Sequence, residues 1–156
     1  MPVNQTVTDT TGYMLNVVQA SDASPATIAL NAGGTGAATE TVVFIAPVSP
    51  NESYINVNRV TVTPTSAITG AGTHWNIVSM ALYKTDGSAY ATPPAGTYTT
   101  QTSLGKYVSK NIATATGGFA MKPGEVLTIK NTGNDSTGAA TPALVVNVEY
   151  SIIPYI

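Results

Sequence analysis

The feature that most constrains the fold is an alternation of residue types near the end of the chain. Pro142 and Pro154 bound this segment, at strand ends where proline is tolerated. The positions on one side are Leu144, Val146, Val148, Tyr150 and Ile152, and those on the other are Ala143, Val145, Asn147, Glu149 and Ser151. A period of two is typical of a strand with one buried face. We therefore predict a strand over residues 143–152.

The rest of the chain favours strands as well. Thr, Val, Ile and Tyr dominate, and they favour strands, whereas the usual helix formers Leu, Glu, Lys, Gln and Arg are scarce. Further strands are predicted over residues 13–18, 42–46, 54–63, 76–85 and 126–130, with a weaker one within 107–113. Many short strands separated by Gly and Pro predict an all-β antiparallel sandwich or barrel.

Local signals add detail to three of these segments. Pro123 and Gly124 suit the centre of a type II turn before residue 126, and Glu125 is placed to accept a hydrogen bond in it. The apolar phase of residues 54–63 slips near Asn58 and Arg59, which predicts a bulge or corner. Residues 86–87 are a common turn pair, and residues 89–106 and 131–141 read as long loops.

A chain of 156 residues fits one domain. Residues 1–40 have weaker strand patterns and are rich in Ala, Ser, Thr, Asp and Gly. We divide the chain into residues 1–40, either an extended arm that packs on a neighbouring subunit or an edge segment, and residues 41–156, the β-sandwich domain.

Charge and hydropathy exclude two kinds of partner. Charged residues make up 9% of the chain, and Arg59 is its one arginine. Nucleic-acid binding needs clustered Lys and Arg, so we expect no nucleic-acid partner. No apolar run approaches the length of a membrane helix, so we expect no membrane association. The start of the sequence has no secretory signal pattern, and we expect synthesis and use without export.

The residues that usually carry chemistry are scarce. Cysteine is absent, which excludes thiolate nucleophiles and disulfides, and His74 is the single histidine. His74 lies between a glycine-rich turn and a strand, where we expect a turn or surface role. The acidic residues are isolated in sequence and fall short of a calcium loop. We expect no catalytic, cofactor-binding or metal-binding residues, no cofactor and no enzymatic activity.

Exposed aromatic residues offer one alternative to a purely structural role. Trp75, Tyr90, Tyr98 and Tyr107 could together form a platform for sugars. A single tryptophan in a small β domain is more often part of a core or an interface. A carbohydrate-binding module is therefore kept as an alternative.

The order of these segments resembles small proteins encoded with the head genes of tailed bacteriophages. The resemblance covers about residues 40–153 and is one of order and style. It rests on the segments 43–47, 55–63, 81–87, 121–128 and 142–150. Proteins of that family decorate or cement the outside of the capsid, often as trimers, and have jelly-roll-like sandwich folds.

The resemblance implies a structural virion protein that binds the major capsid protein and forms a homo-oligomer, with a trimer favoured. It would lie on the capsid surface after synthesis in the host cytoplasm. Another virion component, from the tail, the fibre or the capsid itself, is a further alternative.

Overall fold

Eleven strands make up the regular structure of this computed structural model, which describes residues 3–8, 14–20, 26–28, 39–47, 53–70, 72–92, 96–112, 118–134 and 142–154. None of these residues is helical, which confirms the all-β prediction. The strands are β1 (Val3–Thr8), β2 (Met14–Ala20), β3 (Ala26–Ile28), β4 (Thr39–Ile45), β5 (Ser53–Pro64), β6 (Asn76–Tyr83), β7 (Thr97–Thr99), β8 (Lys110–Asn111), β9 (Phe119–Met121), β10 (Val126–Gly133) and β11 (Leu144–Pro154).

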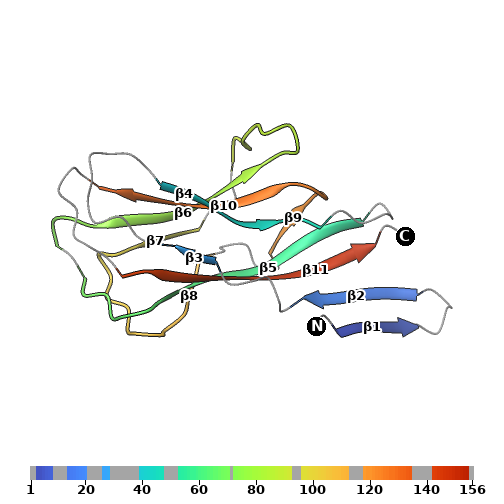
Figure 1. The fold of residues 1–156 in the computed structure, drawn as a ribbon, viewed down its shortest axis with the longest axis horizontal. Coiled ribbons are helices and arrows are strands. Elements are labelled where there is room, and N and C mark those ends of the chain that lie inside the picture. The colour runs from blue at the N-terminus through green and yellow to red at the C-terminus, as the bar shows by residue number, and fades with distance from the viewer. Residues whose placement is uncertain are drawn as a thin grey trace.

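The strands form two antiparallel sheets. Sheet A has the order β1-β2-β11-β5-β8, with β3 also paired to β11 and β9 also paired to β5, and sheet B has the order β4-β10-β6-β7. From β3 to β6 each strand lies in the opposite sheet from the one before, and β9, β10 and β11 alternate in the same way. Figure 1 shows the two layers, with β4, β6 and β10 over β5 and β11. This order is that of a jelly roll, so the predicted jelly-roll-like sandwich is confirmed.

Side chains from both sheets fill the space between the layers. On β11 the alternation predicted from sequence places Leu144, Val146 and Val148 in the core, each at most 2% exposed. Leu127 and Ile129 of β10 are fully buried opposite them, as predicted. Burial of each such side chain contributes about 1.5–3 kcal/mol, so the facing rows hold the sheets together.

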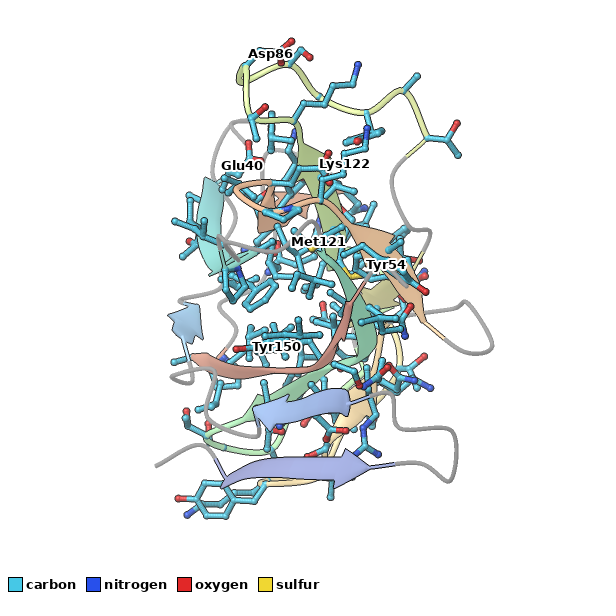
Figure 2. All side chains as sticks on the ribbon, turned by 90° about the vertical axis from the view of Figure 1, so that its right-hand side faces the viewer. Glu40, Tyr54, Asp86, Met121, Lys122 and Tyr150 are labelled. Atoms are coloured by element: carbon cyan, nitrogen blue, oxygen red, sulfur yellow. The ribbon has the colours of Figure 1, made fainter. Side chains whose placement is uncertain are left out.

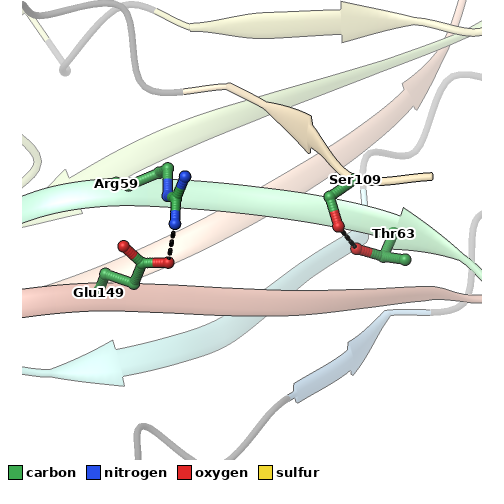
Figure 3. Close-up of polar contacts among 4 residues, drawn as sticks. All are labelled: Arg59, Thr63, Ser109 and Glu149. Carbon is green, nitrogen blue, oxygen red and sulfur yellow. Dashed lines mark hydrogen bonds and ion pairs between the residues drawn. The ribbon is translucent and has the colours of Figure 1, made fainter. Parts of the chain in front are cut away.

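The predicted phase slip in β5 is a bulge at Asn58. Arg59 pairs with Glu149 and Val57 pairs with Tyr150, which leaves Asn58 as the extra residue. The side-chain nitrogen of Asn58 donates to the Ser151 hydroxyl at 2.8 Å. Because of the bulge, Val57 is buried on the same side as Val60, three positions later. The exposed face carries the Arg59–Glu149 ion pair, and nearby Thr63 and Ser109 share a hydrogen bond (Figure 3).

Two predicted loops contain more structure than expected. β10 continues to Gly133, so residues 131–133 are strand, because they pair with β6 as far as Asn76. The remainder of that predicted loop, residues 135–141, lies outside the described residues. The predicted excursion over residues 89–106 contains β7, which pairs with β6 through Tyr98. Tyr98 is 4% exposed, and its burial fixes the segment to the core.

The first strands extend sheet A at one margin. β1 and β2 form a hairpin, and β2 pairs with β11 at Tyr150 and Ser151. β3 pairs with the beginning of β11, from Leu144 to Val146. Figure 1 shows the hairpin beside the C-terminal half of β11. For β1, β2 and β3 the structure describes the backbone and its pairing.

Candidate functional site

The described part of the chain contains no group of three or more His, Asp or Glu side chains that could bind a metal ion. It also contains no helix long and apolar enough to cross a membrane. His74 is half-buried in the segment before β6. The Asn134 side chain fixes that segment: its oxygen accepts from the Trp75 amide at 2.6 Å, and its nitrogen donates to the Thr73 carbonyl at 3.0 Å.

The four aromatic residues considered as an alternative sugar platform do not come together. Tyr98 is in the core, where its hydroxyl donates to the Thr102 carbonyl. Tyr90 bonds to Glu125 just before β10 begins, whereas Trp75 bonds to Asn134 just after β10 ends. A strand of eight residues is about 26 Å long, so Tyr90 and Trp75 lie at opposite ends of sheet B.

A different aromatic site exists at the end of the sandwich where β10 begins. A pocket of about 650 Å³ opens there between sheet A and the segment that follows β6. Figure 2 looks at this end of the molecule and labels Tyr54, Met121 and Lys122 at the pocket. Its lining consists of Tyr54, Leu82, Tyr90, Thr92, Phe119, Ala120, Met121, Lys122 and Glu125. We call it the β5–β9 pocket, since these strands form one wall.

The turn before β10 fixes the polar side of this pocket. Glu125 donates its amide hydrogen to the Lys122 carbonyl, and Gly124 has a φ of +83°. The third position of a type II turn needs a φ of about +80°, so the predicted turn is confirmed. Glu125 is 3% exposed, and its carboxylate accepts from the Lys122 amide at 2.8 Å and from the Tyr90 hydroxyl. The predicted acceptor role of Glu125 is therefore confirmed.

A tight hairpin after β6 places Tyr90 opposite this turn. Asp86 accepts from the amide and hydroxyl of Ser88, at 2.8 and 2.6 Å, and the Tyr90 amide donates to the Leu82 carbonyl. The Lys84 ammonium lies 5.3 Å from the centre of the Tyr90 ring. The hydrogen bond to Glu125, together with burial, raises the pKa of Tyr90, so the phenol stays protonated near neutrality.

The outer face of sheet B carries a second feature, a strip of apolar side chains. Val126 pairs with Ile45 on one side and Tyr83 on the other, so the three share one face. Val42 lies in the next row, beside Thr128. Ile45 is 59% exposed and Val42 is 52% exposed. We call Val42, Ile45, Tyr83 and Val126 the outer strip.

An ion pair closes one end of the outer strip. The Lys130 ammonium lies 3.5 Å from a Glu40 carboxylate oxygen, and the Thr128 hydroxyl also donates to Glu40. Burial by itself raises the pKa of Glu40, but the hydrogen bonds from Thr128 and Tyr83 and the charge of Lys130 outweigh it, so the net pKa is lowered. Glu40 therefore stays ionised and paired at neutral pH.

Sequence reasoning found the Glu125 turn but neither surface as a whole. Tyr54 and Phe119 are far apart in sequence, and both line the β5–β9 pocket because β9 pairs with β5. The outer strip likewise combines residues of β4, β6 and β10. The exposed Val42 and Ile45 fall within a run that reads as fully apolar, so periodicity gave no signal of which side chains face solvent.

The fold and these surfaces define an antiparallel jelly-roll domain. No protein-family model matches the chain, and the search of curated proteins finds no match. Among solved structures, the chain is similar to one in the "Structure of infectious bursal disease virus Gx strain", with a TM-score of 0.34 and 12% identity over 97% of this chain and 35% of that one. The chain thus spans about a third of that viral chain, and at this TM-score the similarity carries no argument about function.

Proposed function

We propose that this protein is a structural virion component that binds the outer surface of a tailed-phage capsid and stabilises it. The observation that carries the proposal is the outer strip, on which Ile45 is 59% and Val42 is 52% exposed. Adjacent exposed apolar side chains on a sheet face favour binding to another protein. A jelly roll is a common architecture of capsid proteins, although the fold alone does not define a function.

Multiple copies would make such a contact effective. One strip offers a small apolar area, but a homo-oligomer presents it several times to a symmetric shell, which raises avidity without new contacts. A trimer on a capsid with local three-fold symmetry meets this requirement. In this proposal the partner is the major capsid protein, and the protein is neither an enzyme nor a binder of nucleic acid or membranes.

Capsids assembled without this protein provide the test. Purified protein should co-sediment with shells made from the major capsid protein of the same phage, and Ile45→Lys should abolish binding. Val108→Lys is the matched control, because Val108 is 50% exposed and lies outside the outer strip. Both variants should keep the wild-type circular dichroism spectrum. Absence of wild-type binding, or equal binding by the Ile45→Lys variant, would overturn the proposal.

A further inference from the structure

The β5–β9 pocket has the size and the lining of a small-molecule site. Its volume of about 650 Å³ lies within the range of about 300–1,000 Å³ usual for ligand pockets. Tyr54 and Phe119 come from sheet A, and Tyr90 comes from the opposite side. Aromatic side chains therefore line the pocket from both sides, and the buried Leu82 and Met121 add to its apolar lining.

Polar groups of the pocket are fixed before any ligand arrives. Glu125 accepts hydrogen bonds from Tyr90 and from the Lys122 amide, which leaves further lone pairs on its two oxygens. The β-turn that carries Glu125 is itself held in place, because the Gly124 amide donates to the Ala46 carbonyl at 2.9 Å. A site with fixed groups loses little entropy when it binds a ligand.

The charges around the pocket argue for a neutral ligand. An anion would approach the Glu125 carboxylate, which lines the pocket without a cationic partner at hydrogen-bond distance among the described contacts. A cation would compete with the Lys84 ammonium for the face of the Tyr90 ring, 5.3 Å away, and the charge of Lys122 in the lining would repel it. A purely apolar ligand would desolvate the Thr92 hydroxyl and the remaining lone pairs of Glu125, at a cost in affinity.

We propose that the β5–β9 pocket binds a neutral carbohydrate. The apolar face of a pyranose ring packs against Tyr54, Phe119 and Tyr90, and its hydroxyls reach Glu125, Thr92 and Lys122 of the lining. This site differs from the platform considered from sequence, with which it shares Tyr90. The proposal is independent of capsid binding, since the pocket contains no residue of the outer strip.

A glycan array that holds neutral, sialylated and sulfated oligosaccharides tests the full-length protein, followed by calorimetric titration with the neutral glycans that bind. Tyr54→Ala should weaken binding about tenfold or more, by loss of ring contact. Ala120→Arg should abolish binding, because the arginine fills the pocket from an exposed position of its lining. This second variant keeps the test valid if Tyr54→Ala fails to fold. Tyr107→Ala is the matched control, because Tyr107 is 67% exposed and lies outside the pocket.

The two proposals can fail separately. Tyr54→Ala and Ala120→Arg should still co-sediment with capsids, and Ile45→Lys should still bind glycans. Three results would overturn carbohydrate binding: no neutral glycan retained on the array, binding confined to anionic glycans, or binding by the Ala120→Arg variant equal to that of the wild type. Equal losses in Tyr107→Ala and Tyr54→Ala would also exclude the pocket as the site.

Discussion

At the residue scale, Gly118 shows how a backbone contact can dictate one amino acid. Its φ is +82°, and a Cβ atom there would lie 2.0 Å from the Val57 carbonyl oxygen of the paired strand. Gly87 has the same φ of +82°, but open space surrounds its Cβ position. The two glycines therefore separate conformational strain from steric overlap.

Gly87→Ala should lower the free energy of unfolding by about 1–2 kcal/mol, the cost of a left-handed alanine. Gly118→Ala should cost a further 1–3 kcal/mol or so, because β9 must move away from β5. Urea denaturation of both variants measures the difference. Equal losses would show that the approach of Gly118 to Val57 is not tight in solution.

Asn131 is a buried residue that the fold tolerates at a cost. It is 1% exposed, and among the described residues neither its side-chain oxygen nor its side-chain nitrogen has a hydrogen-bond partner. An unsatisfied buried amide costs about 1–3 kcal/mol, so Asn131→Leu, a change of similar size, should raise the free energy of unfolding by that amount. Asn147→Leu, on the half-exposed face of β11, is the control and should change it by less than about 0.5 kcal/mol. A destabilised Asn131→Leu variant would contradict this assignment.

At the element scale, strands with a local pattern were predictable and the shortest strands were not. The alternation in β11 and the phase slip in β5 are patterns of residues close together in the sequence, and the structure confirms both. β7 and β9 have three residues each, too few for any period to show. They are strands because long-range pairing to β6 and β5 satisfies their backbone groups, which a single sequence does not reveal.

The sheet edges differ in how they are protected against pairing with other chains. β7 and β8 are short, and β4 carries Glu40 and an irregular register opposite Leu127 and Thr128. β1 has six residues without a charge, a proline or a register shift, and it is the end strand of sheet A. An edge of this kind favours pairing with a strand of a second copy.

Lysines on both faces of β1 should therefore prevent oligomerisation. The double variant Gln5→Lys/Thr6→Lys should be monomeric in light scattering, whereas the wild type should be an oligomer. Asn111→Lys adds one lysine to the exposed, short edge strand β8 and should leave the oligomer intact. A monomeric wild type, or an oligomer in the double variant, would show that β1 is not the contact.

At the scale of the whole molecule, the surfaces depend on tertiary structure. The jelly roll places Tyr54 and Phe119 in the lining of one pocket and pairs Ile45 with Val126, and neither pair is adjacent in sequence. Composition does determine the low charge of the surface, since the entire chain has six basic and eight acidic residues. Contacts made by such a surface rest mainly on apolar burial and neutral hydrogen bonds.

Assembly should therefore be insensitive to salt. Raising sodium chloride from about 0.1 M to about 1 M shortens the Debye length from about 10 Å to about 3 Å, which weakens contacts between exposed charges. The mass measured by light scattering and the fraction bound to capsids should stay constant over this range. Ammonium sulfate should strengthen both, because excluded salts favour apolar burial. Dissociation by sodium chloride would instead assign the contact to charged groups. The first pair to neutralise by substitution would then be Glu40 and Lys130, which lie beside the outer strip.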